Sequence, residues 1–403
     1  MKTLGYSICL GICMAVVLLV TSLPAIAGAG SQPDLPKIVR VSTFGVGTTG
    51  HALVSGMAYA VQKLTGIKML PVPRETETGR FLSIRAREAE FAFTTAQSVS
   101  GPLAGITEFS TEAWGPQKLY RVWMGPNRAG WVASAKSGIK TLRDIKGKRV
   151  PIWPGTSGRI ATDALLAYAN LTWKDVIKVE CPSFAGQIRA AKMGKTDIWW
   201  LGLYARYTIE LAGMPQGARV VNMPPEDKQA WERLRKVAPI YTPTYYKGLP
   251  GELKEAWSTS YPYSLYCYGW ISDKLAYTIT KALWQGYDLY KEKHPELRYF
   301  TPDYAVDLKY LPKGYPPYHP GSVKFFKEIG VWTERHDRWQ ALSLRLMEER
   351  AKAWEEAKQA AKRRGIKINT KAWEEFWEDF LAAYLENKGL PSAPALRRTF
   401  RYQ

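Results

Sequence analysis

Two short segments place glycines and hydroxyl side chains directly before a helix-like stretch. The first reads Gly45-Val46-Gly47-Thr48-Thr49-Gly50, and the second reads Gly155-Thr156-Ser157-Gly158. The free backbone N–H groups at the start of a helix and the positive end of its dipole favour a carboxylate or another anion. The threonine and serine hydroxyls add further donors. We therefore expect each segment to contact an anion, with the two segments facing each other across a cleft.

Each segment also has a plainer interpretation. The first matches the Gly-x-Gly-x-x-Gly pattern of dinucleotide-binding proteins, but no acidic residue follows at the end of a second strand to hold a ribose. In the second, Thr156 and Ser157 could simply cap a helix, as these residue types commonly do. The occurrence of one such segment in each half of the chain favours the shared cleft.

Other polar and aromatic residues beside these segments are candidates for the same cleft. Arg80 and Arg159 could each bind a carboxylate with the planar fork of the guanidinium, or could be ordinary surface cations. Trp199 and Trp200 end a predicted strand, and alternation along a strand would direct one ring to the cleft and the other to the core. His51 either contacts the ligand or is an ordinary residue of the first helical turn.

The residue types needed for hydrolytic or metal chemistry are sparse. The chain has only 4 histidines, at positions 51, 294, 319 and 336, and their contexts indicate neither a metal site nor a catalytic triad. Ser157 lies in Thr-Ser-Gly-Arg, which is not the sequence of a nucleophile elbow. We therefore expect no catalytic residue, no metal and no cofactor.

Strand-like and helix-like segments alternate along the chain, which is typical of parallel sheets with crossover helices. In the first half, strands are expected at 38–43, 67–72 and 90–95, and helices at 51–64 and 79–88. A second unit of this kind begins near residue 129, with strands at 148–153, 176–180 and 197–201 and helices at 159–170 and 184–193. Residues 239–270 are rich in aromatic residues and proline. The pattern predicts two α/β lobes, each with its own glycine loop.

The C-terminal part differs in composition. Residues 338–364 are charged and helical in pattern, and a last helix is expected from about Thr370 to Lys388. On that helix an apolar stripe follows the i, i+3, i+4, i+7 spacing, including Trp373, Trp377 and Leu381. We expect this stripe to dock on the rest of the chain.

The N-terminus has the pattern of an export signal. An apolar stretch from Ile8 to Val20 is followed by Pro24 and by the small-x-small sequence Ala25-Ile26-Ala27. The stretch is shorter than the ~20 residues that a membrane-spanning helix needs. Cleavage after Ala27 would leave Cys181 and Cys267, which could form a disulfide or remain buried thiols.

The charge balance favours an anionic partner. With 56 Lys and Arg against 36 Asp and Glu, the net charge is +20. The basic residues are dispersed, and neither zinc-finger spacing nor an aromatic RNA-binding motif is present, so we expect no nucleic acid as partner.

Four segments in order resemble the TAXI family, the binding subunits of tripartite ATP-independent periplasmic (TRAP) transporters. They are the first glycine loop, residues 79–93 ending Glu-Ala-Glu-Phe-Ala-Phe, residues 142–158 with Leu-Arg-Asp-Ile-Lys-Gly-Lys-Arg-Val and the second loop, and residues 319–330, His-Pro-Gly-Ser-Val-Lys-Phe-Phe-Lys-Glu-Ile-Gly. The resemblance implies a two-lobed periplasmic-binding-protein fold of the Venus flytrap, type II-like kind. It further implies a small carboxylate solute, such as a dicarboxylate, 2-oxoacid or acidic amino acid, TRAP permease subunits as partners, and no cofactor.

The chain departs from the family where a cleft-lining Tyr-Tyr pair is usual, because it reads Ala52-Leu53-Val54 there. The ligand could therefore also be an uncharged or aromatic solute that stacks on Trp199 or Trp200, instead of an anion. Transport has two alternatives. The protein could be a sensory protein that presents its ligand to a receptor, or an exported enzyme that acts on an anionic substrate.

These arguments give one set of expectations. The expected parts are a signal peptide at 1–27, a first lobe at 31–130 plus 268–330, a second lobe at 131–267 and a helical extension at 331–403. The expected ligand-binding residues are Thr48, Thr49, His51, Arg80, Thr156, Ser157, Gly158, Arg159, Trp199 and Trp200. The expected protein is a periplasmic, non-enzymatic binding protein.

Overall fold

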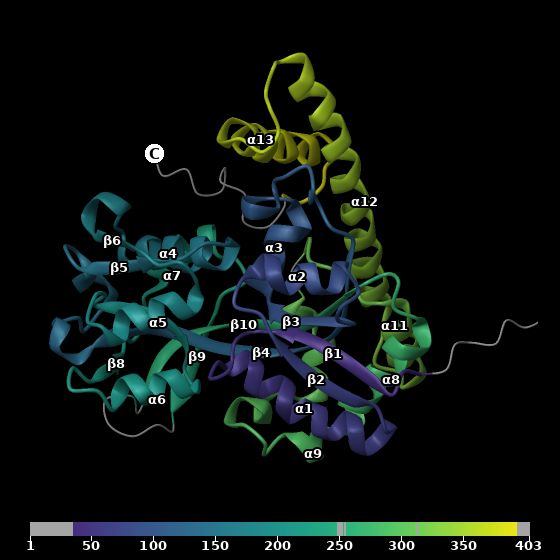
Figure 1. Cartoon of the computed structure of the whole chain (residues 1–403), viewed down its shortest axis with the longest axis horizontal. Helices are drawn as coiled ribbons and strands as arrows, with labels where there is room; N and C mark the ends of the chain where they lie inside the picture. Colours follow the sequence, from purple (N-terminus) through teal and green to yellow (C-terminus); the bar gives the residue numbers. More distant parts are fainter. Residues whose placement is uncertain (1–34, 248–252, 254, 312, 393–403) are drawn as a thin grey trace, which may run out of the picture. The chain divides into compact units, whose positions relative to one another are not determined.

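Two long antiparallel strands form the centre of the fold (Figure 1). The computed structural model describes residues 35–247, 253, 255–311 and 313–392, so the expected signal peptide and its cleavage site lie outside the described residues. Strand β4 covers Leu119–Ser134 and β10 covers Glu255–Tyr268. Their pairing runs from Thr259 opposite Ala129 to Tyr268 opposite Leu119. The two ends of this ribbon join different neighbours, and this divides the fold into two lobes.

The first lobe surrounds the end of the ribbon that carries Leu119. There β10 pairs with β3 (Phe91–Thr95), β3 pairs in parallel with β1 (Ile38–Thr43), and β1 pairs in parallel with β2 (Lys68–Pro73). The helices of this lobe are α1 (Thr49–Thr65), α2 (Glu77–Arg85), α3 (Ala96–Ala104), α8 (Asp273–Gln285), α9 (Tyr287–Tyr290), α10 (Pro302–Val306) and α11 (Pro320–Glu328). Every residue of β3 is buried, because strands flank it on both sides and helices cover the sheet.

The second lobe surrounds the other end of the ribbon. There β7 (Ile198–Gly202) and β8 (Ala218–Val220) pair with β4, and β9 (Thr242–Lys247) pairs with β10. A separate parallel pair is formed by β5 (Arg149–Ile152) and β6 (Ile177–Glu180). The helices of this lobe are α4 (Thr156–Ala169), α5 (Phe184–Lys192), α6 (Arg206–Ala212) and α7 (Lys228–Val237).

A pair of prolines marks the passage of the ribbon between the lobes. Pro126 on β4 lies directly opposite Pro262 on β10. On one side of this pair β10 joins β3 from Tyr263 onward, and on the other side it joins β9 up to Ser260. Neither proline can donate a backbone hydrogen bond, so the ladder is weakened where the strands change lobes. We expect the ribbon to bend at this point.

The alternation predicted from the sequence is confirmed, with shifts of a few residues at the element ends. Helix α2 begins at Glu77 instead of Gly79, because the Thr76 hydroxyl accepts from the Gly79 N–H and caps it. The aromatic segment 239–270, for which the sequence predicted no element, contains β9 and the whole of the ribbon strand β10. The fold is therefore α/β, with two lobes of the periplasmic-binding-protein kind and a helical extension.

The extension consists of α12 (Glu334–Arg363) and α13 (Lys371–Asn387), which pack against each other (Figure 1). Its predicted docking is confirmed, because Trp373, Trp377, Leu381 and Leu385 are fully buried. The Trp377 indole N–H donates to the Ala104 carbonyl at the end of α3, 3.0 Å away.

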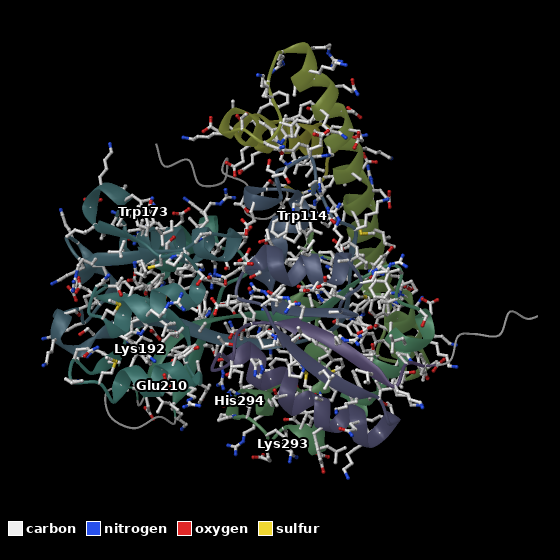
Figure 2. The ribbon with its side chains drawn as sticks, viewed as in Figure 1. Trp114, Trp173, Lys192, Glu210, Lys293 and His294 are labelled. Atoms are coloured by element: carbon white, nitrogen blue, oxygen red, sulfur yellow. The ribbon has the colours of Figure 1, made fainter. Side chains whose placement is uncertain are left out.

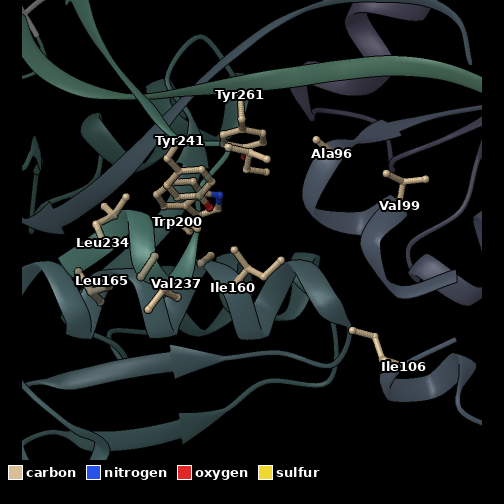
Figure 3. Close-up of a cluster of buried hydrophobic side chains, with 14 of the residues drawn as sticks. Ala96, Val99, Ile106, Ile160, Leu165, Trp200, Leu234, Val237, Tyr241 and Tyr261 are labelled. Atoms are coloured by element: carbon tan, nitrogen blue, oxygen red, sulfur yellow. The ribbon is translucent and has the colours of Figure 1, made fainter. Parts of the chain in front are cut away.

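One buried apolar cluster continues from the first lobe through the second and into the extension. Figure 3 shows Ala96, Val99 and Ile106 of the first lobe opposite Ile160 of the second. The lobes are thus packed against each other. Within the described part of the chain, no helix combines the length and apolarity needed to cross a bilayer.

Candidate functional site: a cavity between the lobes

A narrow cavity of about 30 Å³ lies where the two lobes meet. It is lined by seven aromatic residues, by hydroxyls, by two amides and by no ionisable acid or base other than tyrosine. The lining residues are Phe44, Thr48, Thr49, Thr95, Gln97, Ser98, Asn127, Trp153, Ser157, Phe184, Trp200, Leu201, Gly202, Ala205, Tyr207, Tyr261 and Tyr263. Some of these come from each lobe, so the lobes must part before a solute of several atoms can enter.

The ribbon supplies one wall through its strand register. Tyr261 of β10 lies opposite Asn127 of β4, and Tyr263 lies two residues farther along the strand on the same face. The Tyr263 ring is stacked on Phe93 at 5.0 Å and meets Phe44 edge-on at 5.9 Å. These contacts hold the Tyr263 side chain in place on the β3 side of the proline pair.

The first glycine loop reaches the cavity through its threonines. Thr48 caps α1, since its hydroxyl accepts from the His51 N–H and donates to the Gly45 carbonyl. Thr49 is 4% exposed, and its hydroxyl has no hydrogen-bond partner in the described part of the chain. A Cβ at Gly202 would come within 2.3 Å of that hydroxyl, so this glycine of the second lobe allows Thr49 to approach. His51 does not line the cavity, and burial lowers the pKa of its imidazole.

The second glycine loop is already occupied by a carboxylate of the protein. Glu77 of α2 accepts hydrogen bonds from the backbone N–H groups of Thr156 and Ser157 at 3.0 and 2.9 Å. The Ser98 hydroxyl donates to the same carboxylate. Burial raises the pKa of Glu77, and the nearby Arg80 cation partly opposes this effect. The helix terminus predicted to hold an anion thus binds a side chain from the opposite lobe.

The Arg80 guanidinium is buried beside Glu77. Its side chain is 2% exposed, and the guanidinium lies over the Phe44 ring at 4.0 Å. It donates to the Arg74 carbonyl, while burial lowers its pKa and the charge of Glu77 acts in the opposite direction. Arg80 lines a neighbouring cavity of about 110 Å³ together with Glu75, Glu77 and Glu108. Arg80 is therefore a buried cation, and the alternative expectation that it is an ordinary surface cation is wrong.

Apart from Ser157, the residues of the second loop and the adjoining Arg159 contact other parts of the protein and do not line the inner cavity. Gly158 is required for packing, because a Cβ there would lie 2.1 Å from the Trp153 carbonyl oxygen. The Arg159 guanidinium lies 3.1 Å from Glu378 of α13. Thr156 is fully buried, and its hydroxyl lies 3.0 Å from that of Thr107. Of this loop, Ser157 lines the cavity.

The two tryptophans of β7 separate as alternation along a strand predicts. Trp200 lines the cavity, and its ring is stacked with Tyr241 and Tyr261 at 5.8 and 6.3 Å (Figure 3). Trp199 is fully buried in a different cluster with Val132. The ring at the cleft is therefore Trp200.

Two contacts between the lobes close the outer side of the cavity. The rings of Phe44 and Phe184 meet edge-on at 6.4 Å, and both rings also line a larger outer cavity of about 450 Å³. The Tyr207 hydroxyl donates to the Val46 carbonyl at 2.9 Å. Lys192 lies over the Tyr207 ring and pairs with Glu210 of the next helix (Figure 2).

Sequence reasoning missed most of the cavity wall. Gln97 follows the end of β3, and Trp153 follows β5, so the rule that ligands bind beyond the carboxyl ends of strands could have found both. No sequence signal identifies Asn127, Tyr261 or Glu77, because their positions depend on strand register and on the approach of the two lobes.

Within the described ranges, no cluster of three or more His, Cys, Asp or Glu is placed to hold a metal ion. Cys181 and Cys267 are both free and buried. Burial raises the pKa of both thiols.

The geometry defines an α/β protein with two lobes, joined by a strand ribbon, and a cavity enclosed between them. A family model described as the NMT1-like family matches residues 80–330, and the chain belongs to that family. This match includes both ribbon strands and the second glycine loop.

Several solved structures are similar at low identity. The alkanesulfonate-binding protein SsuA from Xanthomonas axonopodis pv. citri, bound to MOPS, is 14% identical, with 91% of this chain and 99% of that chain covered and a TM-score of 0.41. The aliphatic sulphonate binding protein SsuA from Escherichia coli is 14% identical, with 92% and 93% covered and a TM-score of 0.41. An ancestral arginine-binding protein bound to arginine is 15% identical, with 65% and 99% covered and a TM-score of 0.41.

Proposed function

We propose that the protein is a periplasmic solute-binding protein that closes its two lobes on a small organic molecule and carries out no chemistry on it. The observation that supports this most is the aromatic cavity enclosed between the two lobes. Among the described strands, β4 and β10 are the pair that runs from one lobe into the other. Such clefts bury most of a ligand's surface, and hinge closure around a ligand is a common binding mode.

The interlobe contacts support a closing mechanism. Glu77, Tyr207 and Phe184 each reach across the cleft to a partner in the other lobe. A solute that contacts both lobes would add its own interactions to these and shift the population toward the closed form.

The solute class has two candidates. An anion, expected from the sequence, would be bound by the start of α1 with its Thr48 and Thr49 hydroxyls. An uncharged or aromatic solute would instead stack on the ring of Trp200. TRAP permease subunits are the proposed partners, and this proposal follows from the resemblance of the loop and closing segments to TAXI proteins.

Export is part of the same proposal. The mature chain would begin at Gly28 after removal of the signal sequence. N-terminal sequencing of protein from the periplasmic fraction checks this, and retention of Met1 in the membrane fraction would contradict it.

Solute binding is tested by small-angle X-ray scattering and native mass spectrometry on gently purified mature chain. We expect a bound small molecule, and a smaller radius of gyration with solute than after its removal. The matched control is Pro126→Trp, in which a bulky side chain at the proline pair should hinder closure. A chain that carries no molecule, and whose radius is unchanged by every solute tested, would contradict the proposed function.

A further inference from the structure

The inner cavity is lined by four buried polar atoms that have no hydrogen-bond partner among the residues that the structure describes. They are Thr49 Oγ1, Gln97 Nε2, Asn127 Oδ1 and Trp153 Nε1. The exposed fractions of these residues are 4, 1, 2 and 3% respectively, and all four line the cavity. A buried polar group without a partner destabilises the fold, so several of them around one cavity indicate a site built for a polar ligand.

The chemical types of these atoms are mixed. Gln97 Nε2 and Trp153 Nε1 are donors, Asn127 Oδ1 is an acceptor, and the Thr49 hydroxyl is both. A carboxylate would satisfy the donors and leave Asn127 facing an acceptor. An ammonium group would satisfy Asn127 and leave both donors unpaired. A neutral group with one acceptor and one donor, such as an amide, a lactam or a urea, satisfies both kinds.

The charges near the cavity also disfavour an anion. Ser98 and Ser157 line the cavity, and each donates a hydrogen bond to the Glu77 carboxylate, which therefore lies directly behind the wall. Arg80 faces Glu77 and is covered by the Phe44 ring, so it is not available to the inner cavity. An anionic solute would lose its hydration in this cavity, with no cation in the lining to compensate.

The aromatic walls determine the rest of the solute. The Trp200 ring is held in a stack by Tyr241 and Tyr261, whose planes lie within 18° of each other (Figure 3). Phe44 and Phe184 close the outer side. Flat rings held in fixed orientations favour a flat apolar body.

We propose that this cavity binds an uncharged, flat solute whose apolar ring lies against Trp200 and Tyr261 and whose polar end has both a donor and an acceptor for Gln97, Asn127 and Trp153. The carboxylate of Glu77 takes the helix terminus at which an acidic ligand would otherwise bind. This inference rests on the proposed function and specifies its ligand class.

The test compares neutral and charged molecules of the same shape on the mature chain freed of bound solute. Benzamide and nicotinamide are paired with benzoate and nicotinate, benzylamine tests the cation, and glutarate and 2-oxoglutarate test aliphatic acids. By calorimetry and thermal shift, we expect the amides to bind at least tenfold more tightly than their acids. Equal or tighter binding of any acid or of benzylamine overturns the inference and leaves solute binding intact. If no compound of any class binds, and none changes the radius of gyration, both the inference and the proposed function fail.

A pair of variants tests whether Gln97 binds the polar end of the solute. Gln97→Leu removes an unpartnered buried donor, so the solute-free chain should melt at the same or a higher temperature, while benzamide affinity should fall at least tenfold. Gln216→Leu, the same change outside the cavity, should leave affinity unchanged. If Gln97→Leu lowers the melting temperature but leaves the affinity for benzamide unchanged, the role of Gln97 is purely structural and its assignment as a ligand-binding residue is overturned. Trp153→Phe, which keeps the ring and removes the N–H, provides the second variant.

Discussion

The Arg159 guanidinium of the second lobe lies 3.1 Å from the Glu378 carboxylate of α13. The Glu378 side chain is 1% exposed, and the same helix donates a hydrogen bond from Trp377 to the end of α3 in the first lobe. The C-terminal extension therefore contacts both lobes on one side of the cleft. An opening of the lobes must stretch or break one of these contacts, which couples the extension to closure.

The Arg159–Glu378 pair is expected to stabilise the closed fold. Arg159→Met leaves the buried Glu378 carboxylate without this partner, so the free energy of unfolding should fall by about 2–4 kcal/mol. Glu378→Gln should restore part of this loss in the double variant, because the buried negative charge is then gone. Urea unfolding of the two single variants and the double variant measures the coupling. Strictly additive effects would contradict a direct interaction.

The docked tryptophan Trp377 should be a main source of stability for the extension. It is fully buried, meets Trp354 edge-on at 4.8 Å and donates to Ala104. Trp377→Ala should lower the free energy of unfolding by about 3–5 kcal/mol. Phe380→Ala, on the half-buried edge of the same helix, is the matched control and should cost less. Equal losses would indicate that the stripe is not anchored by Trp377.

Glu77 should be required for lobe closure. Its carboxylate accepts hydrogen bonds from the opposite lobe and faces the buried Arg80, so Glu77→Ala leaves two N–H groups and a cation without this acceptor. We expect a larger radius of gyration in solution and a loss of about 3 kcal/mol in unfolding free energy. The neighbouring Glu75→Ala removes an exposed carboxylate and should change neither quantity appreciably. An unchanged radius for Glu77→Ala would show that closure does not depend on this contact.

Stability should depend on pH through Glu108. Burial, with a further contribution from the negative charge of Glu77, raises the pKa of Glu108 to about 7, and Arg80 opposes this effect. The folded chain then keeps this proton to a higher pH than the unfolded chain, whose carboxyl has its ordinary pKa of 4.5. The contribution of Glu108 to stability therefore falls as the pH rises from about 4.5 to 7 and stays low above that range.

The variant Glu108→Gln checks this pH dependence. It should be more stable than the parent chain by about 1–2 kcal/mol at pH 8, and the difference should vanish at about pH 3, well below both pKa values, where the glutamate is protonated in both states. Urea unfolding at both pH values measures the difference. A variant that is less stable than the parent at pH 8 would be the contrary result.

The sequence by itself determined the elements and their class. The helix predicted at 51–64 is α1, which begins after its cap Thr48 and ends at the left-handed Gly66, and the apolar stripe of α13 forms the buried face that its spacing predicted. Such signals act within one or two turns of chain, so they can be read without the fold. The two-lobed class followed from their order, and β10 was missed because prolines and hydroxyl residues interrupt its apolar pattern.

Only the tertiary structure decided what reaches the cleft. The start of α4 has the composition of an anion site, but its N–H groups bind Glu77, which lies 80 residues before Ser157 in the chain. Arg159 faces the extension, Trp200 and not Trp199 faces the cavity, and Asn127 meets Tyr261 through the register of two distant strands. The physical reason is that a donor or a ring is defined by its own residue, whereas its partner is defined by which distant segments the packed core brings together.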